Sequence, residues 1–108
     1  MKQWEVWTCA FAGADEHPAV IVSHPVRAER KQVVEVLLCS TQRGGAVPGP
    51  HEVVLNTEDG LDGKTVCRCD LIYSVPRDDL RDRRGLVSLE RRRDIVRKII
   101  WSHGWSGL

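Results

Sequence analysis

Short apolar runs separated by proline, glycine and small polar residues fill the chain as far as Pro76, and this spacing limits how it can fold. Runs rich in β-branched residues and bounded by turn residues predict β-strands. The longest of them, Val33–Ser40, is predicted to be the central strand, and His24–Lys31 a turn or short helix. The other predicted strands are Trp4–Cys9, Pro18–Ser23, Glu52–Leu55 and Lys64–Val75, the last broken or bent near Asp70.

One amphipathic segment follows the strands and predicts a C-terminal helix. Ser88 is a suitable N-cap, and the helix is expected to end before Gly104. Ile95, Val96, Ile99 and Ile100 fall on one side of this helix, and Arg91, Arg92, Arg93, Arg97 and Lys98 fall largely on the other. The apolar side is predicted to face the core. The predicted fold is therefore mainly β with a terminal helix, a small β-barrel or curled sheet capped by that helix.

The length of 108 residues predicts one domain over 1–108. This size excludes a multi-domain enzyme and a doubly wound nucleotide-binding sheet. No apolar run approaches the roughly 20 residues of a membrane span, and the N-terminus lacks the apolar stretch of a secretion signal. We therefore expect a soluble, cytoplasmic protein.

The net charge of +1 conceals an uneven distribution. Between Arg77 and Lys98, eight arginines and one lysine stand against five acidic residues. A local basic surface of this kind can attract phosphate. The alternative, favoured by the charges alone, is a solvated helix face with paired charges.

Four cysteines raise the question of a metal site or disulfides. Cys67-Arg68-Cys69 is a C-x-C sequence with no second pair nearby, unlike the knuckles of zinc sites. All of them, Cys9 and Cys39 included, lie in apolar strand-like runs. Buried, reduced thiols are therefore the favoured interpretation.

The sequence Cys67-Arg68-Cys69-Asp70 carries the clearest possible chemistry. Side chains alternate along a strand, so that Arg68 and Asp70 share a solvated face and the two cysteines share the opposite, buried face. A guanidinium and a carboxylate at this spacing can both reach one phosphodiester, where the Asp accepts a proton and the Arg stabilises charge. The spacing alone is more typical of an exposed ion pair, and without further context we favour that alternative.

Several other residues give weaker signals. Trp4 and Trp7 are three apart, so a bend or one exposed ring is expected, with burial in the core favoured. His24 and His51 stand beside prolines and are expected to be exposed. Arg43, in the long loop Thr41–His51, is within the kind of segment that often contacts substrate.

The motifs of the chain, in their order, resemble those of the MazF/PemK/Kid family of toxin endoribonucleases. Val66-Cys67-Arg68-Cys69-Asp70 is similar to the V-V-R-C-D stretch of the Kid/PemK branch. The other similar segments are Trp4-Glu5-Val6-Trp7, His17-Pro18-Ala19-Val20-Ile21-Val22-Ser23, Val36-Leu37-Leu38-Cys39-Ser40-Thr41, the lead-in Gly60-Leu61-Asp62-Gly63-Lys64-Thr65, and Gly85-Leu86-Val87-Ser88.

This resemblance implies an SH3-like β-barrel that works as a homodimer and cuts single-stranded mRNA without a metal or other cofactor. The ribose 2′-OH would attack the adjacent phosphate to give a 2′,3′-cyclic phosphate and a 5′-OH. By position, Asp70 is the expected general base and Arg68 the general acid or phosphate stabiliser. Ser40 and Thr41 are the expected RNA contacts, with Arg43 in support. An antitoxin protein would cover the RNA groove with a peptide segment.

Two departures leave other functions open. Many relatives carry Arg where this chain has His17, which either takes part in proton transfer or leaves the phosphate to Arg68. The tail Trp105-Ser106-Gly107-Leu108 is loosely similar to that of the gyrase poison CcdB, although a disordered tail is the simpler expectation. The alternatives are a CcdB-like gyrase-binding toxin without nuclease activity, and a catalytically silent barrel that binds RNA or protein.

Overall fold

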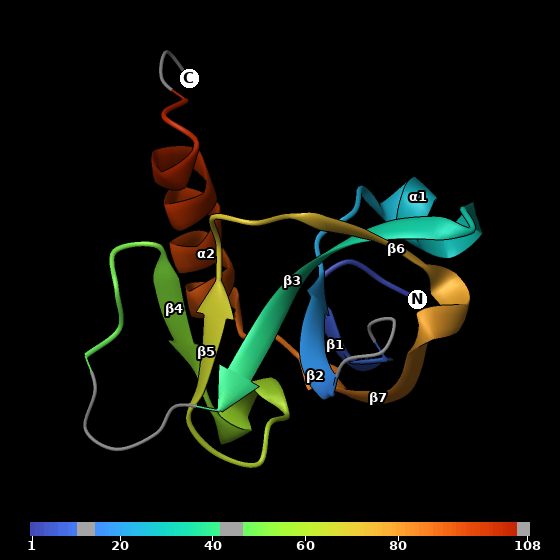
Figure 1. Ribbon diagram of the computed structural model, residues 1–108, viewed down its shortest axis with the longest axis horizontal. Helices are drawn as coiled ribbons and strands as arrows, with labels where there is room; N and C mark the ends of the chain where they lie inside the picture. The colour runs from blue at the N-terminus through green and yellow to red at the C-terminus, as the bar shows by residue number, and fades with distance from the viewer. Residues whose placement is uncertain (11–14, 42–46, 106–108) are drawn as a thin grey trace.

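The computed structural model describes residues 1–10, 15–41 and 47–105. Seven strands form a mainly antiparallel sheet in the order β4-β5-β3-β2-β1-β7, with β6 pairing β3 beside that path. The predicted fold class is confirmed: the sheet curls into a barrel-like shape without closing, and α2 covers part of it (Figure 1). The strands are β1 (Glu5–Ala10), β2 (Glu16–Ile21), β3 (Val33–Thr41), β4 (Glu52–Leu55), β5 (Thr65–Arg68), β6 (Tyr73–Pro76) and β7 (Leu80–Leu86). The helices are α1 (Pro25–Arg30) and α2 (Leu89–Ser102), with two single 3₁₀ turns, η1 (Thr57–Asp59) and η2 (Arg77–Asp79).

Strand β3 joins the two halves of the sheet. Its first residues pair with β6, from Val33 opposite Pro76 to Val36 opposite Tyr73. Its last residues pair with β5, with Cys39 opposite Cys67. Along its middle, β3 also pairs with β2. The predicted break near Asp70 is the point at which the chain leaves β5 and crosses to β6.

Side chains of the central strands point alternately into two apolar cores. On β3, Leu37 and Cys39 enter a core that includes Ile95 of α2, whereas Val34 and Val36 enter a core that includes Ala28 of α1. Burial on both faces explains why the sequences of β2 and β3 are nearly continuously apolar instead of alternating with polar residues.

The two N-terminal tryptophans pack against different cores because the chain bends between them. Trp4 lies just before β1 with a positive φ of 73° and packs against the first core, whereas Trp7 packs against the second. The pairing of β1 with β7 shifts register on both sides of Trp7. The expected bend is therefore present, and both rings are half-buried.

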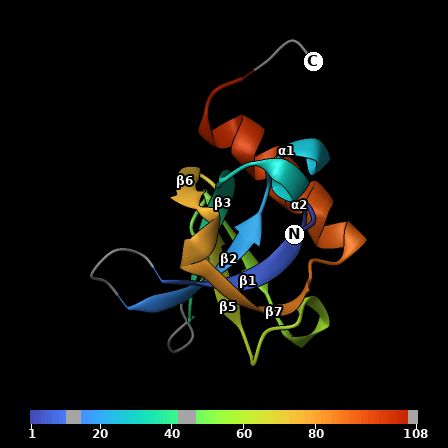
Figure 2. The ribbon, with the colours of Figure 1, turned by 90° about the vertical axis from the view of Figure 1, so that its right-hand side faces the viewer.

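Helix α2 begins and ends as predicted but presents a narrower apolar face. The Ser88 hydroxyl accepts a hydrogen bond from the Arg91 backbone N–H at 3.4 Å, and the helix ends at Ser102. Ile95 is buried and Ile99 packs beside it, but Val96 is 42% exposed, contrary to the prediction. The C-terminal end of the helix stands clear of the strands in both views (Figures 1 and 2). Within the described residues, no helix is long and apolar enough to cross a membrane.

A buried carboxylate ties the start of α2 to the sheet. Asp59 is fully buried, and its two oxygens accept hydrogen bonds from the backbone N–H groups of Ser88 at 2.9 Å and Asn56 at 3.0 Å. The Arg91 guanidinium lies 3.4 Å from the same carboxylate. Beside this carboxylate the backbones of Gly60 and Gly85 are in contact. A Cβ at Gly85 would lie 2.5 Å from the Asp59 carbonyl oxygen, so only glycine allows this approach.

Replacing Asp59 by Ala is expected to lower the free energy of unfolding by about 3–5 kcal/mol, because two backbone donors and a guanidinium lose their acceptor inside the protein. Urea unfolding followed by circular dichroism measures the change. The matched control is Asp62→Ala, which removes a carboxylate that is fully exposed and pairs with Arg84 at the surface. Equal urea midpoints for the two variants would show that Asp59 does not anchor the helix.

Candidate functional site

Arg68 and Asp70 form an ion pair at the point where β5 ends. The Arg68 Nη2 atom donates to Asp70 Oδ2 at 2.9 Å. Cys67 and Cys69 are fully buried on the opposite side, as the alternation predicts. The guanidinium is about half exposed, whereas one carboxylate oxygen, Asp70 Oδ1, is buried and has no hydrogen-bond partner among the described residues.

This pairing keeps both groups charged. The hydrogen bond from Arg68 is the largest cause that lowers the pKa of the Asp70 carboxyl from 3.8, and electrostatic interactions with Arg68 and His51 lower it further against partial desolvation. The same hydrogen bond raises the pKa of the Arg68 guanidinium. A guanidinium held this firmly in its charged form is suited to binding a phosphate and ill suited to releasing a proton.

A cavity of about 260 Å³ brings three of the predicted site residues together. It is lined by His17, Leu38, Cys39, Ser40, Arg68 and Tyr73. The pairing of β3 with both β2 and β5 explains the meeting, because His17 lies near the start of β2, Ser40 near the end of β3 and Arg68 at the end of β5. We refer to this cavity as the Arg68 cavity.

The other predicted residues lie around the Arg68 cavity or outside the described chain. Asp70 does not line the cavity, but it forms an ion pair with Arg68, which does. Thr41 lies in an adjoining hollow that shares His17 and Ser40 with the cavity. Arg43 lies outside the described residues.

His51 is half-buried, so the expectation of an exposed side chain is wrong. Its Nδ1 atom lies 2.8 Å from the Ser102 hydroxyl of α2, and its ring meets that of Trp101 with centroids 5.1 Å apart. Its charge acts on Asp70. His24, by contrast, is exposed as expected and caps α1 by accepting from the Val26 N–H.

The sequence argument also missed Tyr73, which lines the Arg68 cavity from β6. No signal in the sequence placed it there, because β6 reaches this position only by pairing with β3. For His51 the sequence offered one indication of a structural role, its position immediately before a predicted strand.

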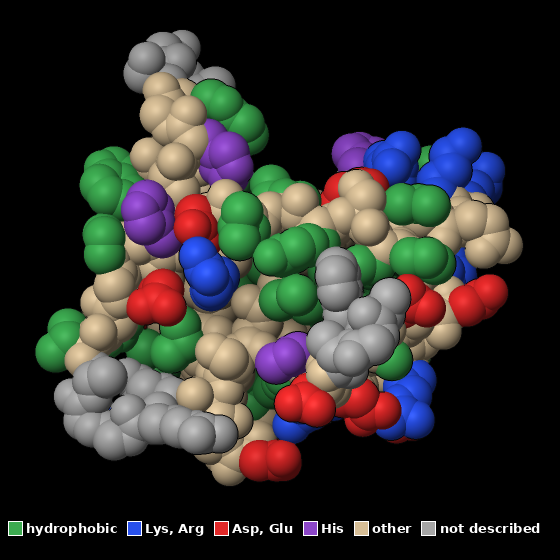
Figure 3. Space-filling model, in the orientation of Figure 1, with side chains coloured by type: hydrophobic (Ala, Val, Ile, Leu, Met, Phe, Trp, Pro, Cys, Tyr) green, Lys and Arg blue, Asp and Glu red, His purple; other side chains and the backbone are tan. Residues whose placement is uncertain are grey.

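Figure 3 shows one face of the molecule, on which acidic, basic and histidine side chains gather over β4 and β5.

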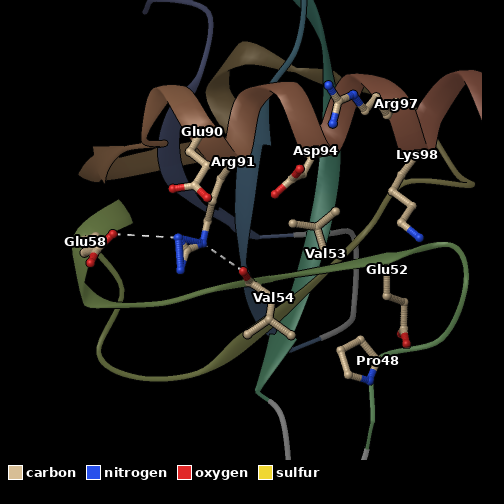
Figure 4. A pocket seen from close by; sticks show the side chains of 10 residues that line it. All are labelled: Pro48, Glu52, Val53, Val54, Glu58, Glu90, Arg91, Asp94, Arg97 and Lys98. Carbon is tan, nitrogen blue, oxygen red and sulfur yellow. Dashed lines mark hydrogen bonds and ion pairs between the residues drawn. The ribbon is translucent and has the colours of Figure 1, made fainter.

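Four of the nine basic residues between Arg77 and Lys98 form ion pairs. The pairs are Arg81 with Glu16, Arg83 with Glu5, Arg84 with Asp62, and Arg91 with both Glu58 and Asp59. The alternative of a surface with paired charges therefore holds for part of the segment, and on α2 for Arg91. A larger cleft of about 520 Å³ between β4 and α2 has the same mixed character: acidic and basic side chains face one another across it, and Arg91 contacts Glu58 and the Val54 carbonyl (Figure 4).

The four cysteines are buried free thiols, as predicted. Contact with Cys39 is the largest cause that raises the pKa of the Cys67 thiol well above 9.0. A thiol that stays protonated is a poor metal ligand and a poor nucleophile. The described part of the chain holds no group of three or more metal-ligating side chains.

Comparisons with known proteins place the fold. A family model described as PemK-like, MazF-like toxin of type II toxin–antitoxin system matches residues 2–103. No curated protein matches the sequence.

Solved structures with the same fold include toxins from two bacterial groups. One is an endoribonuclease in complex with its cognate antitoxin from a mycobacterial species, with TM-score 0.81 and 22% identity over 100% of this chain and 97% of that chain. Another is the Mycobacterium tuberculosis toxin MazF-mt6, with TM-score 0.81 and 18% identity over 95% and 99%. A MazE–MazF complex from Deinococcus radiodurans has TM-score 0.77 and 18% identity over 98% and 97%.

The Arg68→Met variant is expected to raise the pKa of the Asp70 carboxyl, because desolvation then acts without the hydrogen bond that outweighs it. Side-chain carboxyl NMR during an acid titration measures this pKa. In the wild type the pair contributes stability at neutral pH that is lost as the pH falls through the lowered pKa of Asp70. An unchanged pKa in the variant would mean that other groups hold Asp70 ionised.

Proposed function

The chain belongs to the PemK-like, MazF-like toxins of type II toxin–antitoxin systems, and from that premise we propose that it is an endoribonuclease that cuts single-stranded RNA in the cytoplasm without a metal ion. The family resemblance drawn from the sequence motifs is thereby confirmed. The observation that carries the proposed activity is the Arg68 cavity, in which an exposed guanidinium, an imidazole and a hydroxyl converge beside an ionised carboxylate.

In the proposed reaction the ribose 2′-oxygen attacks the adjacent phosphorus. The O2′–P bond forms as the P–O5′ bond breaks, leaving a 2′,3′-cyclic phosphate and a 5′-OH. Arg68 binds the phosphoryl oxygens and stabilises the charge that develops on them. A phosphate that draws the guanidinium toward it frees Asp70 Oδ2, which takes the proton of the 2′-OH as general base.

The leaving 5′-oxygen needs a proton, and His17 is the donor that we propose. The raised pKa of Arg68 makes the guanidinium a weak acid, whereas an imidazole exchanges protons near neutral pH. His17 lines the same cavity as Arg68. Ser40 and Thr41 would contact the RNA through their hydroxyls, and Arg43 remains the expected additional phosphate contact.

We propose that the toxin works as a homodimer and that an antitoxin peptide covers the RNA groove. Two of the structural neighbours are complexes of a toxin with its antitoxin. Exposed apolar side chains next to the site support a surface that contacts another protein chain. Leu71, Ile72 and Trp101 are each at least 40% exposed.

Cleavage of a long unstructured RNA in the presence of EDTA tests the activity. The wild type is expected to make discrete cuts with cyclic-phosphate ends. The Arg68→Met and Asp70→Asn variants are each expected to be slower by roughly 10²–10⁴-fold, because each loses one group that acts in the transition state.

The matched control is Arg27→Met. Arg27 pairs with Glu35 at 2.9 Å and is about as exposed as Arg68, but it lies on α1, away from the Arg68 cavity. This variant is expected to cut at the wild-type rate. A folded wild type that cuts no RNA would overturn the nuclease and favour the gyrase-binding toxin, for which removal of residues 105–108 would then abolish gyrase inhibition.

The pH dependence of the cleavage rate identifies the base. With Asp70 as base, the rate is expected to hold as the pH is lowered to about 5, because the carboxyl stays ionised below its ordinary pKa of 3.8. If a histidine were the base, the rate would instead fall about tenfold per pH unit below about pH 6.5.

A further inference from the structure

A second hollow adjoins the Arg68 cavity and has a different chemistry. Its volume is about 270 Å³, and it is lined by Asp15, Glu16, His17, Pro18, Ser40 and Thr41. His17 and Ser40 belong to both hollows. A chain of nucleotides bound with one phosphate at Arg68 would therefore place a neighbouring nucleotide in this second hollow, which we call the acidic subsite.

The lining of the acidic subsite disfavours phosphate. Among the described residues, those that line it include two carboxylates and no lysine or arginine. Glu16 forms an ion pair with Arg81 of β7, which orients its carboxylate, while Asp15 is exposed. Carboxylates accept hydrogen bonds, so the ligand that suits the acidic subsite is a neutral group that donates them.

The bases of RNA differ in this respect. Adenine, cytosine and guanine each carry an exocyclic amino group with two N–H donors, whereas both exocyclic groups of uracil are carbonyl oxygens and its one donor on this edge is the ring N3–H between them. A carboxylate accepts from an amino group such as N4 of cytosine and repels a carbonyl oxygen. Bases of single-stranded RNA are unstacked and expose these edges to a protein.

We propose that the acidic subsite binds one base beside the cleaved bond and selects bases that carry an exocyclic amino group against uracil. Asp15 and Glu16 accept from the amino group, and the hydroxyls of Ser40 and Thr41 complete the contacts. This inference rests on the proposed ribonuclease function and assigns the residues that determine its specificity.

The test compares the wild type with the double variant Asp15→Asn/Glu16→Gln on an RNA pool of random sequence, with the new 5′ ends sequenced. The wild type is expected to disfavour uracil at one of the nucleotides flanking the cut. The amides of the variant can donate to the carbonyl oxygens of uracil, so cleavage at uracil is expected to rise about tenfold relative to the wild type at that nucleotide alone. Glu58→Gln, the same chemical change in the cleft between β4 and α2, is expected to leave the preference unchanged.

A wild type that prefers uracil at both flanking nucleotides, or a double variant with the wild-type preference, would overturn the acidic subsite while leaving the nuclease intact. If the wild type cuts nothing, the proposed function fails. Selection of RNAs that bind the wild type and the double variant, from the same pool, then tests the subsite by itself: equal uracil content in the two bound pools would overturn it.

Discussion

The whole site depends on the pairing of β3 with three other strands. β3 holds β6 beside its first half, β5 beside its end and β2 along its other edge. This arrangement alone brings His17, Ser40 and Arg68, which are far apart in the sequence, to one cavity. Because side chains alternate along a strand, a slip of β3 by one residue would take Leu37 and Cys39 out of the core that includes Ile95 and turn Ser40 toward it. The register is therefore held by the core, and the site inherits the rigidity of that core.

A second constraint fixes the position of helix α2. The sheet does not close, and contacts at the first residues of α2 tie this helix to it. Asp59 does this by accepting from the backbone at Ser88 and pairing with Arg91, at a place where Gly60 and Gly85 allow the two backbones to touch. Helix α2 in turn holds His51 through Ser102, and the charge of His51 acts on Asp70. The position of the helix thus bears on the electrostatics of the site.

Two ion pairs of equal length show that an exposed pair of arginine and carboxylate is by itself a weak guide to function. Arg27–Glu35 and Arg68–Asp70 both measure 2.9 Å and have similar exposure. The first links α1 to β3 and has the Ser23 hydroxyl as a further partner of its carboxylate. The second borders a cavity that also holds an imidazole and a hydroxyl. What distinguishes them is the surrounding sheet, which brings further reactive groups to one pair and not to the other.

The sequence by itself determined the features that depend on neighbouring residues. Alternation predicted that Cys67 and Cys69 are buried opposite Arg68, and Ser88 predicted the start of α2, because both follow from local backbone geometry. Strand β7 was not predicted, since its sequence is mostly charged and it forms only because β1 offers it an edge. The places of Tyr73, His51 and Asp59 were likewise decided by the tertiary structure. Each depends on contacts between segments distant in the sequence, and no local pattern records those contacts.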